Sequence, residues 1–230
     1  MGVHLADVAR LTAAACAHLA AFGRHVHVKR GASISAYEGV VALGDIAVSV
    51  SREGKPGLDL GFLGPGELLG AERLFLDYPP VAGRALRDGD VWYVSNEAAQ
   101  RAIVERQGLR AALMQIAMAS CADHFRRAAG IVEKRADRRV AQWLFECANM
   151  LETSELKITH DEIANALGVR RSSVTDSLHM IEGVRVIRSQ RGRLKILDPT
   201  GLAHYAGLDV AHERAGSPRR AAERAALAAL

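Results

Sequence analysis

Two short helical patterns joined at one glycine occupy residues 158–181, ITHDEIANALGVRRSSVTDSLHMI, and no other stretch constrains the fold of the chain as strongly. Thr159 and Glu162 have the spacing of a capping box, which satisfies the exposed amides at a helix start. Gly168 can take the left-handed conformation that ends a helix. Because apolar residues recur at helical spacing on both sides of this glycine, the stretch predicts a helix-turn-helix.

The start of the second predicted helix is crowded with arginine and hydroxyl residues. A hairpin that only packs needs nothing particular there, and arginines are mildly unfavourable beside the positive end of a helix dipole. In a DNA-reading helix-turn-helix this turn enters the major groove, where arginine bonds guanine and hydroxyls bond phosphates or base edges. We therefore expect DNA contacts from the starts of both helices: Thr159, His160, Arg170, Arg171, Ser172, Ser173, Thr175 and Asp176.

A basic segment, residues 184–197, follows directly. Its turn residues, Ser189-Gln190-Arg191-Gly192, stand between two short apolar runs and predict a hairpin. Such a hairpin behind a helix-turn-helix is placed as a wing that touches phosphate. Its expected contacts are Arg188, Arg191 and Arg193. A solvated charged hairpin is the alternative, which the absence of acids between residues 182 and 198 disfavours. The net charge of +4 permits an anionic partner without identifying one.

The preceding part of the chain divides into two patterns. Short apolar alternations broken by glycine run from about residue 24 to residue 95 and predict a small antiparallel barrel or sandwich. After residue 96 the apolar period becomes helical. One long helix is expected to pair with its copy in a second chain, although packing on its own domain is the alternative. The expected pairing residues are Leu109, Leu113, Ile116, Ala117, Ser120 and His124.

Other classes of protein find little support in the sequence. The cysteines Cys16, Cys121 and Cys147 lie far apart, so they indicate neither a zinc site nor a disulfide framework. We expect reduced thiols in a cytoplasmic protein, without a membrane span or a membrane partner. The glycine-rich GFLGPGELLG lacks the Lys-Ser/Thr of a phosphate-binding loop, and no catalytic triad appears, so an enzyme is not expected.

Across about residues 20–200 the chain resembles the Crp/Fnr family of bacterial transcription regulators. The resemblance is carried by RRVAQWLF, ITHDEIANALGVRRSSVT and IRSQRGRLKILD, in forms most like those of alpha-proteobacteria. It implies an α+β fold: a cyclic-nucleotide-binding-like β-roll (a jelly roll) within residues 1–103, a dimerisation helix within 104–134, a winged helix-turn-helix within 135–200 and an Arg/Ala-rich tail from 201 to 230. It also implies a homodimer on a near-palindromic operator, with half-sites roughly 34 Å apart. RNA polymerase would be a further partner of an activator.

The effector cassette departs from this resemblance. Cyclic-nucleotide-binding members offer a Glu to the ribose and an Arg-Ser pair to the phosphate. Alignment at Leu74-Phe75 puts Ala71 at the position of the Glu, and Val81 and Ala82 at those of the pair, with Glu72 and Arg84 displaced. A phosphate without its arginine loses a charge-assisted contact. We therefore expect no cyclic AMP binding of the usual kind, and a shifted register that uses Arg84 is the alternative.

The resemblance leaves the signal and the target open. Iron–sulfur sensors of the family need four cysteines, and this chain has three. No cofactor is predicted, but His25, His27 and His124 keep haem open and Cys121 keeps redox sensing open. The alternative function is a ligand-sensing signalling protein whose winged helix contacts another protein. Arg171 keeps the commonest base-contacting arginine of the family, whereas Ser172 and Asp176 replace the usual Glu and Arg, so the operator sequence should differ.

Overall fold

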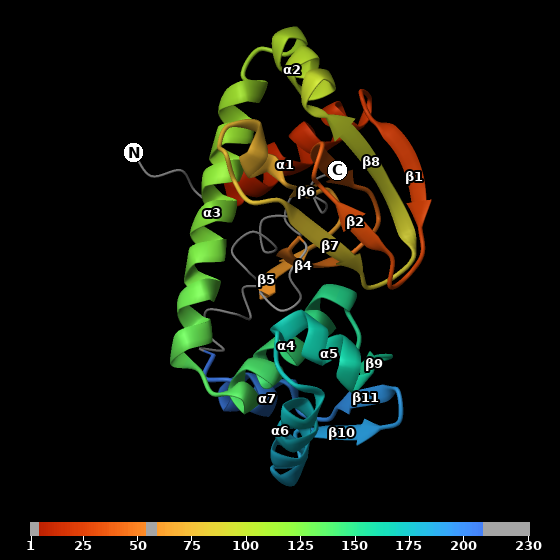
Figure 1. Cartoon of the computed structure of the whole chain (residues 1–230), viewed down its shortest axis with the longest axis vertical. Coiled ribbons are helices and arrows are strands. Elements are labelled where there is room, and N and C mark those ends of the chain that lie inside the picture. Colours follow the sequence, from red (N-terminus) through yellow and green to blue (C-terminus); the bar gives the residue numbers. More distant parts are fainter. Residues whose placement is uncertain (1–4, 54–58, 209–230) are drawn as a thin grey trace.

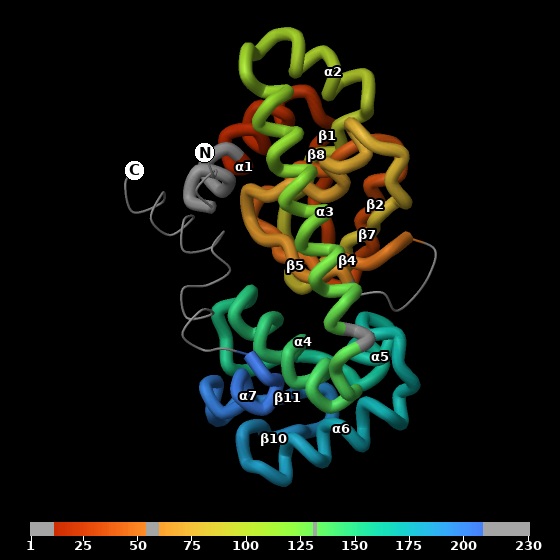
Figure 2. Tube along the Cα trace, turned by 90° about the vertical axis from the view of Figure 1, so that its left-hand side faces the viewer, coloured from red at the N-terminus to blue at the C-terminus, as the bar shows by residue number. Residues whose placement is uncertain are grey.

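The computed structural model describes residues 5–53 and 59–208, which form two domains joined by one long helix. Figure 1 shows a β-roll at one end of the molecule and a smaller, mainly helical domain at the other. The long helix α3, Leu109–Glu133, runs past the β-roll and ends at the helical domain (Figure 2). The expected α+β fold is confirmed, with antiparallel sheets before the long helix and a helix-turn-helix after it.

The β-roll consists of two antiparallel sheets that share one apolar core. One sheet has the strand order β1-β8-β3-β6, and the other has the order β2-β7-β4-β5. The strand β3 is buried along its whole length, because Val41 faces this core and Val40 faces a second core beneath the helices. Its sequence GVVAL therefore lacks polar alternation. The strands are β1 Arg24–Val28, β2 Ser33–Ser35, β3 Gly39–Leu43, β4 Val48–Arg52, β5 Asp59–Leu63, β6 Leu68–Leu69, β7 Val81–Ala85 and β8 Gly89–Ser95.

Helices cover the outer face of the first sheet. They are α1 Leu5–Ala20, the 3-10 helix η1 Ala71–Leu74, α2 Asn96–Glu105 and α3. The hydroxyl of Ser95 caps α2 by accepting a hydrogen bond from the amide of Ala98 at 3.1 Å. Gly108, with φ 84°, then starts α3. The expected helical segment 104–134 therefore contains the end of one helix and the whole of the next.

The carboxyl-terminal domain packs four helices and a small sheet around the buried side chain of Trp143. Its sheet has the order β10-β11-β9, in which Ile187 pairs with Ile196 across the two strands of the wing. The elements are α4 Ala136–Leu151, β9 Glu155–Leu156, α5 His160–Leu167, α6 Arg171–Gly183, β10 Ile187–Gln190, β11 Arg193–Ile196 and α7 Pro199–Tyr205.

The expected tail from residue 201 begins too early. Leu202, Ala203 and Ala206 are fully buried in the core of the carboxyl-terminal domain. The carboxylate of Asp198 accepts a hydrogen bond from the amide of Gly201 at 2.9 Å and caps α7, which begins with a proline. A seven-residue helix of this kind gives little periodicity in the sequence. The Ala-rich stretch AERAALAAL lies outside the described residues.

Several side-chain contacts join the two domains. The rings of Phe62 on β5 and Trp143 on α4 lie 5.4 Å apart between centroids. Nη2 of Arg127 on α3 lies 2.7 Å from Oε2 of Glu146 on α4, and both side chains are mostly buried. Among residues 5–53 and 59–208, none of the helices combines the length and apolar character that crossing a membrane requires.

Candidate nucleic-acid interface

The first helix of the helix-turn-helix begins with a complete capping box. The amide of Glu162 donates to the hydroxyl of Thr159 at 3.2 Å, and the amide of Thr159 donates to Oε2 of Glu162 at 2.8 Å. Gly168 ends the helix with φ 63°. The capping box and the glycine hinge expected from the sequence are both confirmed, and they fix the angle at which α6 leaves α5.

The start of α6 presents polar side chains to solvent. Val174, Leu178 and Ile181 anchor the opposite face in the core, each at most 1% exposed. Of the expected contact residues between 170 and 176, four are exposed and two are half-buried. The exposed ones are Arg170, Arg171, Ser172 and Asp176, and the half-buried ones are Ser173 and Thr175. Four of the six also line one shallow, open depression on the surface: Arg171, Ser172, Thr175 and Asp176.

Polar contacts tie the two helix starts together. Nδ1 of His160 lies 2.9 Å from the hydroxyl of Thr175, which also donates to the carbonyl of Arg171 at 3.2 Å. Nε of Arg171 lies 3.5 Å from Oδ1 of Asp161. The sequence prediction omitted Asp161, whose only signal is an acid in the first turn of α5. This ion pair engages Nε and leaves the terminal nitrogens of Arg171 for a bidentate acceptor.

The wing carries its cations on one face. Its inward side chains, Leu194 and Ile196, are buried, whereas the expected contacts Arg188, Arg191 and Arg193 are exposed. Arg188 stands directly opposite Lys195 across the two strands. Like charges in that position destabilise a hairpin, so an anionic partner would offset a real cost. One acid does approach, since Oε1 of Glu155 on β9 lies 3.7 Å from Nζ of Lys195.

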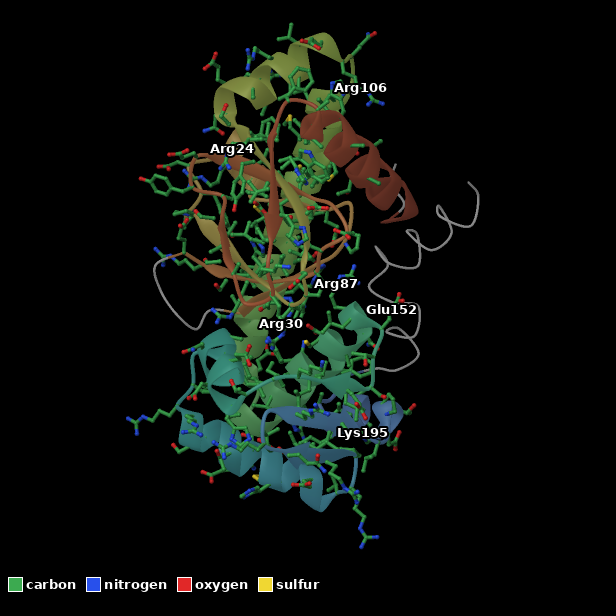
Figure 3. All side chains as sticks on the ribbon, turned by 90° about the vertical axis from the view of Figure 1, so that its right-hand side faces the viewer. Arg24, Arg30, Arg87, Arg106, Glu152 and Lys195 are labelled. Atoms are coloured by element: carbon green, nitrogen blue, oxygen red, sulfur yellow. The ribbon has the colours of Figure 1, made fainter. Side chains whose placement is uncertain are left out.

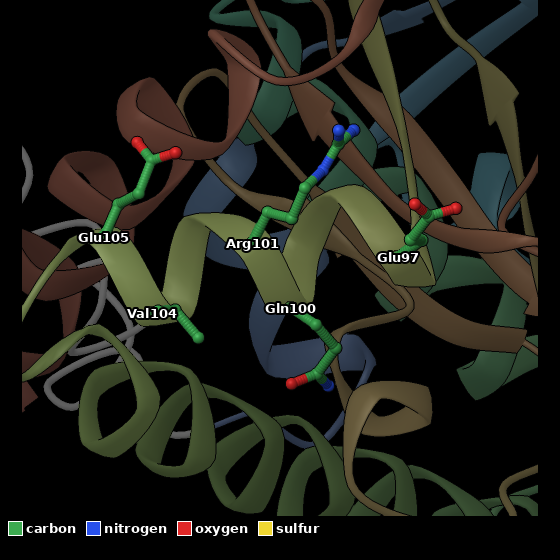
Figure 4. Close-up of a pocket in the computed structure, with 5 residues that line it drawn as sticks. All are labelled: Glu97, Gln100, Arg101, Val104 and Glu105. Carbon is green, nitrogen blue, oxygen red and sulfur yellow. The ribbon is translucent and has the colours of Figure 1, made fainter.

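A second shallow surface lies on α2 (Figure 4). Glu97, Arg101 and Glu105 point to one side of the helix, and Gln100 and Val104 point to the other. These side chains do not converge on a common point. The surface therefore has no arrangement that would hold a ligand, and the exposed start of α6 with the wing remains the candidate interface.

Comparison with known proteins agrees with this geometry. A family profile described as a Crp-like helix-turn-helix domain matches residues 138–205, which include most of α4 and all of α5 to α7. A solved protein assigned to the crp/fnr family of transcriptional regulators, from Eubacterium rectale, is 24% identical with a TM-score of 0.68. The match covers 84% of this chain and 94% of that one. Residues 138–205 thus match a Crp-like helix-turn-helix domain, and the chain shares the fold of solved Crp/Fnr regulators.

Further Crp/Fnr structures share the fold over most of its length. A CRP/FNR-family transcriptional regulator from Thermus thermophilus is 25% identical, with a TM-score of 0.55 over 80% of this chain and 98% of that one. FixK2 from Bradyrhizobium japonicum is 15% identical, with a TM-score of 0.60 over 80% of this chain and 96% of that one. Among curated proteins, no relative matches the chain.

The residues of the expected effector cassette differ in their exposure to solvent. Glu72 is 2% exposed within η1, beside the fully buried Ala71, and Val81 is buried. Arg84 is exposed, on the face of β7 opposite Val81. At Gly83, between Val81 and Ala85 on the buried face, a Cβ atom would lie only 3.2 Å from Val48, so the adjacent interior is filled. Ala82 is half-buried.

The residues of α3 expected to pair with a second chain lie on a face that packs within the chain. Five of these residues are buried on the side of α3 that contacts α1 and η1, and they are at most 6% exposed: Leu109, Leu113, Ile116, Ala117 and Ser120. His124 is also engaged, since its Nδ1 lies 3.0 Å from the hydroxyl of Tyr78. The large apolar side chains exposed on α3 are instead Met114, Met118 and Phe125, exposed by 45%, 71% and 77%. Helical spacing alone cannot distinguish these two faces.

The histidines and cysteines have structural partners or inert surroundings. Nε2 of His25 and Nδ1 of His27 lie 3.1 and 2.9 Å from the same oxygen of Asp90, and these contacts hold the pKa of that carboxyl below its usual range. Burial raises the pKa of the Cys121 thiol, and nearby Glu72 raises it further. Within the described residues, no group of three metal-binding side chains converges.

Proposed function

We propose that the chain is a sequence-specific DNA-binding transcription regulator. The observation that carries this proposal is the exposed start of α6 beside a wing whose outward cations face each other. Arg170, Arg171 and Ser172 at the start of α6 would enter the major groove. Arg188, Arg191 and Arg193 would bind phosphates and set the position of the domain on the duplex. Such a regulator would act in the bacterial cytoplasm, and an activator would also contact RNA polymerase.

The near-palindromic operator of the proposal requires a homodimer. Six exposed apolar residues of α3 recur at steps of three and four, as in the seam of a coiled coil. They are Ala111, Met114, Met118, Ala122, Phe125 and Ala129. A stripe of this length exposed on a single chain indicates an interface. Pairing along it would place two recognition helices on half-sites about 34 Å apart.

The proposed regulator works without cyclic AMP. The position of the family's phosphate-binding arginine is occupied by the buried Val81, and the nearest arginine in the sequence, Arg84, faces solvent. An anionic ring phosphate would therefore enter an apolar interior without a cationic partner, which costs several kcal/mol (roughly 2–7 for a polar group alone).

Operator binding by the purified chain tests the DNA proposal. Genomic fragments enriched by the protein should share a two-fold motif, and affinity should fall steeply as salt rises, because bound phosphates release counterions. A protein that enriches no fragment even at low salt would refute DNA binding. The alternative, a winged helix that contacts another protein, gives neither a shared motif nor a salt slope of this kind.

Met118→Glu tests the homodimer. We expect the unaltered chain to sediment as a dimer and the variant as a monomer, because the change would bury a carboxylate in the proposed interface. Val104→Glu is the matched control, since Val104 is 82% exposed on α2, away from the stripe. It should leave the dimer intact. A monomeric unaltered protein that still binds a palindromic site tightly would overturn the proposed pairing.

A further inference from the structure

One arginine of the β-roll reaches into the helix-turn-helix. Arg30 lies in the turn between β1 and β2, at the boundary between the two domains (Figure 3). Its Nη2 atom lies 2.9 Å from Oε1 of Glu162 and also donates to the carbonyl oxygen of Lys157. The two partners flank the beginning of α5. A residue of the β-roll thus holds the start of a helix 132 positions away in the sequence.

Glu162 takes part in two contacts at once. One carboxylate oxygen receives Arg30, and the other closes the capping box by accepting from the amide and hydroxyl of Thr159 at 2.8 and 3.0 Å. The carboxylate is only 23% exposed, so solvent screens this ion pair less than it would screen one on the open surface. Arg30 therefore contacts the side chain that caps the start of α5, the first helix of the helix-turn-helix.

The turn that carries Arg30 is itself held in place. The amide of Arg30 donates to Oδ1 of Asp88 at 2.8 Å, and Nζ of Lys29 lies 2.9 Å from the other oxygen of that carboxylate. The domain boundary also contains the Arg127–Glu146 ion pair. Two arginines from the amino-terminal side thus meet two glutamates of the carboxyl-terminal domain. Complementary charge of this kind fixes an orientation more than it adds stability.

We propose that Arg30 is a positioning residue for DNA reading: by holding Glu162 and the carbonyl of Lys157, it fixes the orientation of the helix-turn-helix relative to the β-roll. This inference rests on the proposed DNA-binding function. With the domains in this arrangement, Arg171 and Ser172 remain exposed. The Arg30 contact therefore leaves the proposed DNA-binding surface open. A domain fixed in advance loses less orientational freedom when two readers engage two half-sites, and this preorganisation favours binding.

Arg30→Ala and Lys29→Ala form a matched pair of variants. Each removes one cation from the same turn. Lys29, however, pairs with Asp88 inside the β-roll and not with the helix-turn-helix. We expect Arg30→Ala to weaken operator binding about three- to tenfold relative to Lys29→Ala, the effect of one partly exposed ion pair and its hydrogen bond. On non-specific DNA the two variants should bind alike. Arg30→Lys should recover part of the loss, because an ammonium can replace one of the two contacts.

Amide hydrogen exchange of the full chain tests the contact without DNA. Arg30→Ala should speed exchange in residues 157–162, and Glu162→Gln, which can still close a capping box, should speed exchange in the turn around residue 30. The double variant should change exchange less than the sum of the two single variants. Equal behaviour of the Arg30 and Lys29 variants in both exchange and operator binding would overturn the proposal.

The two measurements separate this inference from the function it rests on. If the unaltered protein binds no operator, the proposed function fails and the role of Arg30 in reading fails with it. The exchange data then still decide whether Arg30 joins the domains. If operator binding is normal and Arg30→Ala equals Lys29→Ala in affinity, the function stands and the positioning role alone is refuted.

Discussion

The winged helix and the β-roll use their polar side chains in opposite ways. On the winged helix, Arg171 and Ser172 face solvent at the start of α6, and Arg188 faces another cation across the hairpin. In and beside the β-roll, several polar side chains pair within the chain: His25 and His27 share one oxygen of Asp90, and Tyr78 bonds His124 of α3. The interior beside Gly83 is occupied by Val48 and Leu69.

The difference supports the proposal that the winged helix, rather than the β-roll, binds the DNA. Exposed cations whose own structure leaves them in unfavourable surroundings are suited to an outside partner. Side chains that already pair with each other, as Asp90 does with His25 and His27, have less to offer a ligand. The β-roll then contributes chiefly through its contacts with other parts of the chain. It packs against α3, and its turn at Arg30 contacts the winged-helix domain.

Among the winged-helix variants, Arg171→Ala should have the largest effect on operator binding. We expect operator affinity to fall by about 1–3 kcal/mol and one base preference to relax, because the arginine would give a bidentate contact to guanine. Binding to operators with each base pair replaced in turn measures both effects. Arg170→Ala is the neighbouring control, which should weaken binding without relaxing a base preference. Unchanged selectivity in Arg171→Ala would remove this residue from the readout.

Alkaline pH should destabilise both regions in the same way, because each contains one buried cysteine thiol. Burial raises the pKa of Cys16 in the β-roll region and of Cys147 in the winged-helix domain from 9.0 to about 12. The folded chain therefore favours the neutral thiols. Their contribution to stability is complete below pH 9 and is lost as the pH rises toward 12, by at most about 1.4 kcal/mol per thiol for each pH unit in that window.

Urea unfolding at several pH values measures this loss. The double variant Cys16→Ala, Cys147→Ala should show a flatter decline in its unfolding midpoint between pH 9 and 11 than the unaltered chain. A decline of the same slope in both proteins would mean that the thiols do not cause it. Tyr78, Tyr93 and Tyr205 also have raised pKa values and act in the same direction, so the comparison of slopes is the decisive measurement.

Local signals in the sequence were sufficient for the helix-turn-helix. The capping box of Thr159 and Glu162, the hinge at Gly168 and the wing turn each depend on residues a few positions apart, so the pattern carries the geometry. The strand alternations likewise predicted an antiparallel barrel or sandwich, although the strands of the two sheets interleave along the chain.

Contacts between distant segments could not be predicted in this way. Both faces of α3 repeat at helical spacing, and only the packing of α1 and η1 decides that Leu113 is covered while Met118 is exposed. The same holds for Arg30 and Glu162, since neither residue has a local pattern that points to the other. Even the buried α7 was missed, because its seven residues are too few for a periodic signal.

Arg191→Ala and Arg84→Ala compare one exposed arginine from each region. Both changes remove the same charge from the surface. The wing variant should weaken binding to all DNA sequences to a similar degree and lower the slope of log affinity against log salt by about 1. The β-roll variant should leave affinity and slope unchanged. Equal effects of the two variants would show that total charge, rather than the wing, governs DNA binding.

The smallest expected effect is that of cyclic AMP, which should not bind the chain. Titration of the purified chain should give no saturable heat, because the buried face of β7 offers Val81, Gly83 and Ala85 where a cyclic phosphate would need a cation. Arg84 could supply that cation only if β7 rotated to turn Val81 outward and Arg84 inward. Such a register would expose the apolar residues that now form the core, since strand side chains alternate between faces. A saturable isotherm lost in Arg84→Ala would demonstrate this rotated register, and a saturable isotherm kept in that variant would show a nucleotide site built from other residues. Either result would make the β-roll a sensor in its own right and end its contrast with the winged helix.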